Sequence, residues 1–249
     1  IRTTPRTAEM IKYTANSLLA TLISFSNEIG NLCAASGVDV VEAMAGVHLD
    51  KRFSPILPDG SRVSPSSLTY LAAGCGFGGS CFPKDVKALI SYGKAAGNGM
   101  ELLSSVIAVN EAQPERMLDM LRRHHPELKG LRVAVLGMAF KPGTDDIRES
   151  PSLPVTQALI DAGAEVHAHD PIARHAAEKQ FPQGVAFHDD LGEALEGAEA
   201  VLLMTSWPEY KALPELLAGR DPAPLVVDGR RFLAKDALPR YEGIGLAGS

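Results

Sequence analysis

One cysteine behind a glycine-rich loop is the feature of this sequence best suited to covalent chemistry. Residues 74–85 read GCGFGGSCFPKD, so four glycines precede Cys81, and Lys84 and Asp85 follow it. Glycine allows a backbone to approach a ligand closely and to adopt positive φ. Lys84 and the amino end of a helix expected near Asp85 would both favour the thiolate of Cys81. The loop therefore indicates a nucleophilic thiol held beside a ligand.

Two other interpretations of the same loop stay open on these residues alone. Residues 74–79 fit the G-x-G-x-x-G pattern of dinucleotide loops, but no clear strand precedes them and Pro83 follows at once. A glycine turn around a buried, inert Cys81 would give the same letters. We regard the dinucleotide interpretation as the weakest of the three, because its structural context is missing.

Metal and disulfide chemistry receive little support. The three cysteines are an odd, sparse set, and no histidine lies within twenty residues of Cys75 or Cys81. His167, His169 and Asp170 lie on an expected strand, where alternation puts both imidazoles on one face by default. We therefore expect no metal, and a reducing, cytoplasmic compartment for the chain.

Length, composition and charge favour some classes of protein and argue against others. With 45% apolar and 22% charged residues in 249, the chain is expected to fold into a good core, and two lobes are plausible on length. A net charge of −6 argues against nucleic acid as a partner. No uninterrupted apolar run reaches the roughly 18 residues of a membrane span, so we expect no membrane association. The sequence starts at Ile1, not Met, which suggests a fragment.

Helices that would position the loop dominate the first half of the chain. Apolar residues recur at helical spacing over residues 6–46, with Thr7 expected as the cap, Pro5 upstream, Gly37 as a stop and one further short helix after it. Residues 47–73 are rich in turn formers, and residues 85–96 predict a helix. Residues 100–128 predict one long helix, or two that abut at Pro114.

The pattern changes at Lys129. Strands are expected within residues 131–140, 164–171, 185–189, 199–207 and 224–231, with a possible sixth at 242–248, and helices at 151–162 and 191–198. Alternation of this kind is typical of a doubly wound parallel sheet. We therefore predict an α/β protein with an all-helical domain over residues 1–128 and a Rossmann-like domain over residues 129–249.

Four stretches resemble the UDP-glucose/GDP-mannose dehydrogenase family. GFGGSCFPKD resembles its active-site signature, residues 8–29 its central helix, residues 134–152 the opening of its second nucleotide-binding domain, and VVDGRR at 226–231 its late arginine motif. The resemblance spans nearly the whole chain. The family's amino-terminal NAD-binding domain has no counterpart here. The resemblance therefore implies a fragment that contains the central, dimer-forming domain and the UDP-binding domain.

The resemblance implies a four-electron oxidation with NAD as the cofactor. A nucleotide sugar, UDP-glucose or a related UDP-sugar, would be oxidised at C6 to the uronic acid through a thiohemiacetal and a thioester on Cys81. Lys12 and Asn16 are four apart, so a helix presents both on one face, where they could stabilise an oxyanion. Asp85 would position water or Lys12, although a helix N-cap is a competing role.

The remaining residue roles are also implied by the resemblance. Contacts with the nucleotide sugar are expected from Tyr70, Phe77, Gly78, Phe140, Lys141, Arg230, Arg231 and Arg62. Between Arg230 and Arg231 we favour Arg230; either Arg62 or Arg52 would reach a partner subunit. Lys84 and Arg148 are expected to contact NAD, and the apolar helix over residues 8–33 to form a homodimer.

A second class of function remains open beside the enzyme. The chain could be a non-catalytic module that binds a nucleotide sugar or supports assembly. The retained Cys81, Lys12, Asn16 and Asp85 argue against it, since a binding module has no need of a thiol. A thiol-dependent acyltransferase would need a histidine base near Cys81, and none is adjacent in sequence. The motifs do not separate UDP from GDP, or glucose from other sugars.

Overall fold

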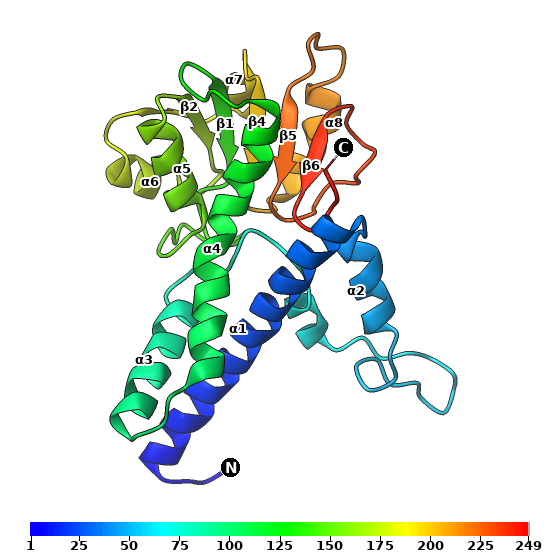
Figure 1. The fold of residues 1–249 in the computed structure, drawn as a ribbon, viewed down its shortest axis with the longest axis vertical. Helices are drawn as coiled ribbons and strands as arrows, with labels where there is room; N and C mark the ends of the chain where they lie inside the picture. Colours follow the sequence, from blue (N-terminus) through cyan, green and yellow to red (C-terminus); the bar gives the residue numbers. More distant parts are fainter. Residues whose placement is uncertain (249) are drawn as a thin grey trace.

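Two lobes share one long helix in the computed structural model, which describes residues 1–248 (Figure 1). The helical lobe contains α1 (Pro5–Ser36), α2 (Val40–His48), the 3-10 helix η1 (Ser66–Tyr70), α3 (Phe82–Ala95) and α4 (Glu101–His124). The sheet lobe follows with β1 (Arg132–Leu136), α5 (Ser152–Asp161), β2 (Glu165–His169), α6 (Arg174–Gln180), β3 (Val185–His188), α7 (Leu191–Leu195), β4 (Ala200–Leu203), η2 (Pro208–Ala212), α8 (Leu213–Leu216), β5 (Leu225–Asp228) and β6 (Tyr241–Gly243).

Local chemistry sets the ends of α1. Thr4 is its N-cap, and the Thr4 hydroxyl accepts a hydrogen bond from the Thr7 amide at 3.2 Å. Our expectation of Thr7 as the cap was therefore wrong; Pro5 fits the first helical position, where its missing N–H costs nothing. The helix ends at Gly37 as expected, with a left-handed φ of 73°.

The faces of α1 are unusual for a helix of a monomer. Its buried residues are small or polar: Ser17, Ala20, Ser24, Ser26, Asn27, Gly30 and Cys33. Its exposed residues include Ile11, Leu18, Phe25 and Leu32, which recur every seven positions. By length and composition alone α1 could also cross a membrane, with a third of its most apolar window buried. The length of uninterrupted apolar runs does not reveal this property, because Ser and Thr break the run in α1 but lower its mean hydropathy only slightly.

Helices α3 and α4 complete the frame around the glycine loop. Helix α3 begins at Phe82, earlier than predicted, because Pro83 is accepted in the first turn and Cys81 becomes the N-cap residue. Residues 101–124 form one continuous helix with Pro114 inside it, which settles the alternative left open by the sequence. Pro114 has no N–H for the carbonyl of Asn110, so this turn of α4 has an unpaired helical acceptor.

The sheet confirms the predicted doubly wound architecture. All six strands are parallel, in the order β3-β2-β1-β4-β5-β6. The order reverses between β1 and β4, and ligands of such sheets bind outside the carboxyl ends of the strands at that point. The short helices α6, η2 and α8 were not predicted from the sequence.

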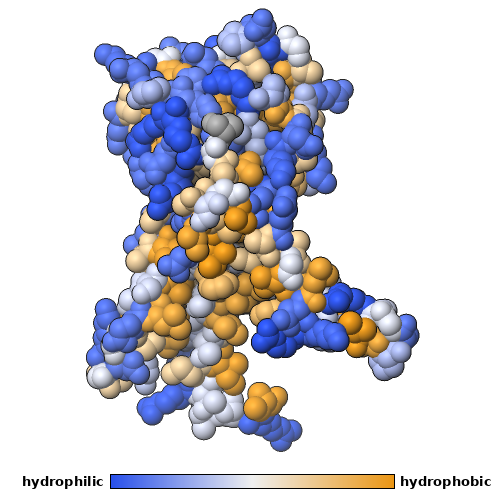
Figure 2. All heavy atoms as spheres, turned by 45° about the vertical axis from the view of Figure 1, so that its right-hand side comes forward, coloured by the Kyte–Doolittle hydropathy of each residue, from blue (hydrophilic) through white to orange (hydrophobic). Residues whose placement is uncertain are grey.

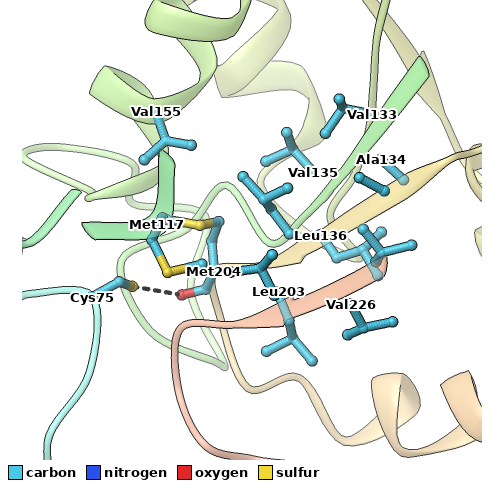
Figure 3. Packing of buried hydrophobic residues seen from close by; sticks show 14 of the residues in the cluster. Cys75, Met117, Val133, Ala134, Val135, Leu136, Val155, Leu203, Met204 and Val226 are labelled. Carbon is cyan, nitrogen blue, oxygen red and sulfur yellow. Dashed lines mark hydrogen bonds between the residues drawn. The ribbon is translucent and has the colours of Figure 1, made fainter. Parts of the chain in front are cut away.

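One apolar core runs through both lobes. Met117, Leu118 and Leu121 of α4 pack against the sheet, and the same cluster includes Cys33 of α1 and Cys75 of the glycine loop. Figure 3 shows Cys75 beside Met117 and Met204, where the loop meets the end of the sheet. A smaller cluster around Phe77 lies among α1, α3 and α4. The division that we predicted at residue 128 follows the end of α4, but the core is continuous across it.

An arm formed by residues 50–65 projects from the helical lobe after α2 (Figure 1, cyan). A single bridge pairs Ile56 with Arg62, and the Arg62 guanidinium donates to the carbonyls of Leu49 and Ser54 at 2.7 and 3.0 Å. The arm is thus held in shape by its own hydrogen bonds.

Candidate active site

A cavity of about 600 Å³ lies between α1, the glycine loop and the carboxyl ends of the strands. Its lining combines predicted residues from four distant parts of the sequence: Asn16, Tyr70, Phe77, Gly78, Cys81, Phe140, Lys141 and Arg230. The sheet's switch point between β1 and β4 opens to the same place, since Phe140 and Lys141 follow β1 and Ser206 follows β4. The structure therefore brings the helical and sheet candidates to one cavity.

Asp85 contacts the other polar candidates of the helical lobe. Its carboxylate is fully buried and accepts a hydrogen bond from the Asn16 amide at 2.6 Å. The ammonium groups of Lys12 and Lys84 lie 3.3 and 3.0 Å from its two oxygens. Asn16 and Lys12 do share one face of α1, as their spacing predicted. Asp85 does not cap α3, because its side chain turns to α1 and α3 has no side-chain cap.

The charge of Asp85 is set by two opposing effects. Burial acts to raise the pKa of its carboxyl, but hydrogen bonds from Lys84, Asn16 and Lys12 outweigh burial, so the pKa lies below its ordinary value. Both lysines are more than half exposed, whereas the carboxylate is not. The site thus holds a permanent buried anion beneath two accessible cations.

The two cysteines of the loop have opposite environments. Cys75 is fully buried, its sulfur lies 3.7 Å from the carbonyl oxygen of Met204, and burial raises the pKa of its thiol (Figure 3). Cys81 is exposed at the amino end of α3 and lines the cavity. The described cysteines are all free. Only Cys81 is therefore placed to act on a bound ligand.

Close approach of two backbones requires glycine at position 78. A Cβ added to Gly78 would lie 2.7 Å from the carbonyl carbon of Glu149 and nearer still to its oxygen. At Gly79, φ is 82° and an added Cβ would meet the Phe140 ring at 2.8 Å. The loop thus fits against the segment that follows β1, and side chains at these positions would push the two walls of the cavity apart.

Arg230 links the sheet lobe to the glycine loop. Its Nε donates to the carbonyl of Met204 at 2.7 Å and its Nη1 to the carbonyl of Gly76 at 2.9 Å. The remaining nitrogen, Nη2, has no hydrogen-bond partner among the described residues. Asp228, fully buried at the end of β5, accepts from the Arg230 amide at 2.8 Å and so orients this turn. Arg230 thus lines the cavity with a guanidinium that is fixed by two carbonyl groups and keeps one buried nitrogen unpaired among the described residues.

Several candidates lie outside the cavity. Arg231 is buried in an ion pair with Asp39, 2.9 Å away, and its φ of 49° turns it away from Arg230. Arg148 pairs with Asp146 through Nε and Nη2 at 2.9 and 2.8 Å. Arg62 is held within its own arm, as described above. Their predicted ligand contacts stay predictions, and within a single copy Arg231 and Arg62 do not face the cavity.

Phe77 contributes to the site differently from what we expected. Its ring is buried against the small core beside Val86 and Val106. Its amide and carbonyl are both paired with the side chain of Asn110, at 2.8 and 3.0 Å. The Phe77 N–H is therefore committed within the protein, and the part of Phe77 that faces the cavity supplies shape.

Four amide side chains that the sequence did not single out hold this loop. Besides Asn110, Asn27 of α1 accepts from the Gly74 amide at 2.8 Å, and Gln113 of α4 donates to the Gly74 carbonyl at 2.7 Å. Asn31 donates to Gln113 at 2.9 Å. Their spacing on α1 and α4 follows the helical repeat, but the sequence gives no sign of partners more than thirty residues away.

The backbone amides of the loop after β1 are already hydrogen-bonded to a side chain. Asp170, at the end of β2, accepts from the amides of Met138 and Ala139 at 2.7 and 2.9 Å. These are the amides that follow the first strand, where dinucleotide-binding sheets receive a pyrophosphate. The Trp207 indole and two further amides also donate to Asp170. This loop of the sheet therefore does not fit a dinucleotide.

Comparison with known proteins places both lobes in one family. Residues 6–112 match the central-domain model of the UDP-glucose/GDP-mannose dehydrogenase family, and residues 134–235 match its UDP binding domain. The chain is 43% identical over 238 residues to UDP-glucose 6-dehydrogenase AglM of Haloferax volcanii, covering 95% of this chain and 51% of that protein. It is 40% identical over 252 residues to the UDP-glucose 6-dehydrogenase of Pseudomonas aeruginosa, covering 96% and 52%.

Solved structures show the same relation. A UDP-glucose dehydrogenase from Pyrobaculum islandicum superposes with a TM-score of 0.85 at 38% identity, covering 98% of this chain and 52% of that one. A GDP-mannose dehydrogenase from Pseudomonas aeruginosa gives a TM-score of 0.63 at 30% identity, covering 98% and 54%. The chain spans about half the length of the relatives it matches.

Proposed function

Because this chain belongs to the UDP-glucose/GDP-mannose dehydrogenase family, we propose that it supplies the sugar-nucleotide pocket and the nucleophilic thiol of an NAD-dependent nucleotide-sugar 6-dehydrogenase. One observation carries the proposal: Cys81 and Asn16 line the same cavity as Lys141 and Arg230. The thiol comes from the loop before α3, and the two cations come from the sheet lobe. A ligand with a sugar at one end and a diphosphate at the other suits this arrangement, and we propose UDP-glucose or a related UDP-sugar.

The cationic side of the cavity would bind the diphosphate. Lys141 is exposed at the carboxyl end of β1, and its ammonium lies 5.5 Å from the centre of the Phe140 ring. Arg230 has one uncommitted nitrogen, and its other nitrogens are fixed by carbonyl groups. A guanidinium already fixed in orientation loses little side-chain entropy when it binds phosphate.

Cys81 would perform the covalent steps. Its sulfur would form a bond to C6 of the sugar aldehyde while the C=O π bond opens, and the thiol proton would pass to the C6 oxygen, which gives a thiohemiacetal. After oxidation to a thioester, water adds at C6, the carbon–sulfur bond breaks, and the thiol and a carboxylate are released. The amino end of α3 at Cys81 and the two ammonium groups above Asp85 all favour negative charge on sulfur or on the C6 oxygen.

Asn16, Lys12 and Asp85 would act together on that C6 oxygen. The Asp85 carboxylate fixes both partners by contacts of 2.6 and 3.3 Å, so their remaining N–H bonds have defined directions. The lowered pKa of Asp85 keeps it anionic and thereby keeps the neighbouring ammonium groups in place. Asp85 is a positioning group for the lysine in this account; Asn16 lines the cavity, and Lys12, held beside it by Asp85, would reach the C6 oxygen from the edge of the cavity.

Bound NAD would supply the hydride acceptor that both oxidations at C6 require. The residues of this chain fit one side of such a cofactor: Lys84 and Arg148 are both exposed cations on the segments that carry Cys81 and Phe140. Asp170 fills the dinucleotide position of the sheet itself. We therefore propose that Lys84 and Arg148 meet the cofactor from the substrate side.

The inverted faces of α1 support a homodimer formed through that helix. Large apolar side chains at Ile11, Leu18, Phe25 and Leu32 are exposed, whereas small residues are buried. Figure 2 shows apolar surface gathered on the helical lobe below the sheet. A seven-residue repeat of large apolar residues is the pattern of a helix that packs along another helix. We propose that α1 of a second copy covers this stripe.

Calorimetric titration of the chain with UDP-glucose, UDP-N-acetylmannosamine and GDP-mannose tests the proposed ligand class. We expect binding of a UDP-sugar, and at least tenfold weaker binding to Lys141→Met, because a cation next to the diphosphate is lost. Lys179→Met, at the end of α6, is the matched control and should bind like the wild type. Absence of binding to all three nucleotide sugars would refute the proposal.

A further inference from the structure

The side chain of Asn110 makes the two hydrogen bonds to the backbone of the glycine loop that a neighbouring β-strand would otherwise make. Its Oδ1 accepts the amide hydrogen of Phe77 at 2.8 Å, and its Nδ2 donates to the carbonyl of the same residue at 3.0 Å. A side-chain amide has one donor face and one acceptor face, so it can satisfy both backbone groups of one residue as a paired strand would. The bond pair spans 33 positions of sequence and fixes the orientation of the peptide groups on both sides of Phe77.

Further hydrogen bonds hold the backbone of the loop on both sides of this pair. The Cys75 amide donates to the Gly229 carbonyl at 2.8 Å, the Gly79 amide to the Arg148 carbonyl at 2.7 Å, and the Gly76 carbonyl accepts from Arg230. All three of these hydrogen-bond partners, Gly229, Arg148 and Arg230, come from the sheet lobe, whereas Asn110 belongs to the helical lobe. Asn110 therefore anchors the side of the loop that faces α1 and α4.

Helix α4 is locally suited to this task. Pro114 gives Asn110 no helical donor at its carbonyl, and Gly76, at φ 106°, packs directly on this turn. A Cβ added to Gly76 would lie 3.1 Å from Oδ1 and 3.4 Å from the carbonyl oxygen of Asn110. The proline, the glycine and the amide thus form one close contact between α4 and the loop.

From these contacts we infer that Asn110 is a positioning residue that sets the shape of the sugar-facing wall, residues 76–79, and so the approach of a ligand to Cys81. The inference rests on the proposed function for the identity of the ligand only. Phe77, Gly78 and Gly79 all line the cavity, and none of them is held by a regular strand or helix. Without the amide, the Phe77 N–H and C=O lose their partners in a mostly buried place, and the wall takes up several conformations.

Hydrogen exchange tests the inference on the chain itself, without any ligand. In Asn110→Ala we expect the peptide that covers residues 74–81 to exchange about tenfold faster or more, the effect of losing one ordinary hydrogen bond. Peptides of α4 around Met117–Leu121 and of β1 should keep their wild-type rates. Asn110→Asp, which keeps the acceptor but places an oxygen against the Phe77 carbonyl, should also loosen the loop. Asn98→Asp is the matched control and should change neither segment.

Two outcomes would overturn the inference. Wild-type exchange over residues 74–81 in Asn110→Ala shows that the amide does not hold the loop. Equal acceleration over α4 and the loop shows that Asn110 only stabilises its own helix. A titration with UDP-glucose accompanies the exchange: Asn110→Asp should bind at least tenfold more weakly than Asn98→Asp. If the wild type itself binds no UDP-glucose, the proposed function fails, and the exchange result still decides the role of Asn110.

Discussion

Replacement of Gly78 by alanine tests how closely the two walls of the cavity fit. The added Cβ would lie 2.7 Å from the carbonyl carbon of Glu149 and 3.0 Å from the Cα of Ser150. Carbon atoms in contact are ordinarily about 3.5–4.0 Å apart, so the backbones must separate by about 1 Å. Neither neighbour is a flexible side chain, and relief has to come from the loop or from the segment after β1.

The magnitude follows from that displacement. Overpacking of a fixed contact costs about 1–3 kcal/mol, which lowers the unfolding midpoint of a chain of this size by about 2–12 °C. A tenfold loss of affinity corresponds to about 1.4 kcal/mol, which lies within that cost. For Gly78→Ala we therefore expect at least tenfold weaker UDP-glucose binding in calorimetry, together with a lower midpoint in thermal unfolding.

Gly46→Ala is the matched control for this prediction. Gly46 lies within α2, and an added Cβ there has no atom within 4 Å among the described residues. Alanine should stabilise that helix by about 0.5–1 kcal/mol and leave ligand binding unchanged. If Gly78→Ala keeps the wild-type midpoint and affinity, the close fit between the loop and the segment after β1 is not a feature of the protein in solution.

Two further predictions concern charge and assembly. The pKa of Asp85 is lower in the folded than in the unfolded chain, so ionised Asp85 stabilises the fold above about pH 4, and this stabilisation is lost as the pH falls through the pKa of the folded state. The difference in unfolding midpoint between the wild type and Asp85→Asn should therefore shrink below pH 4. A difference that does not depend on pH would contradict the ion-pair assignment. Phe25→Glu should convert a homodimer to a monomer in sedimentation velocity, whereas Leu102→Glu should not, although Leu102 at the start of α4 is the more exposed of the two side chains. A dimer that persists in Phe25→Glu would exclude α1 as the interface.

The sequence pattern predicted the sheet well for a physical reason. Strands buried on both faces must be continuously apolar, so segments such as residues 200–203 and 225–228, which are buried throughout, stand out between turn formers. The short helices α6 and α8 escaped prediction because one or two turns are too few to show a helical period. Pro114 could not be assigned in advance, since a proline is compatible with both a break and an interior position when the neighbouring contacts compensate.

The candidate site was predictable only where its chemistry is local. The resemblance to the family indicated Lys12 and Asn16, their spacing of four placed both on one helical face, and the structure does bring them to Asp85. Arg230 and Arg231 are adjacent, and only the positive φ of Arg231, a tertiary property, separates the cavity residue from the buried ion pair. Asn110 could not be recognised, because an asparagine on a helix gives no indication of a backbone partner 33 positions away.

Alkylation of Cys81 in the presence of UDP-glucose tests the central claim most directly. Cys33 and Cys75 are buried and serve as internal controls, so iodoacetamide should label Cys81 alone in the folded chain, as peptide mass mapping would show. If the sugar lies against the thiol, saturating UDP-glucose should slow the labelling of Cys81 at least tenfold. A chain that binds UDP-glucose by calorimetry but labels at an unchanged rate would contradict the claim that Cys81 faces the sugar.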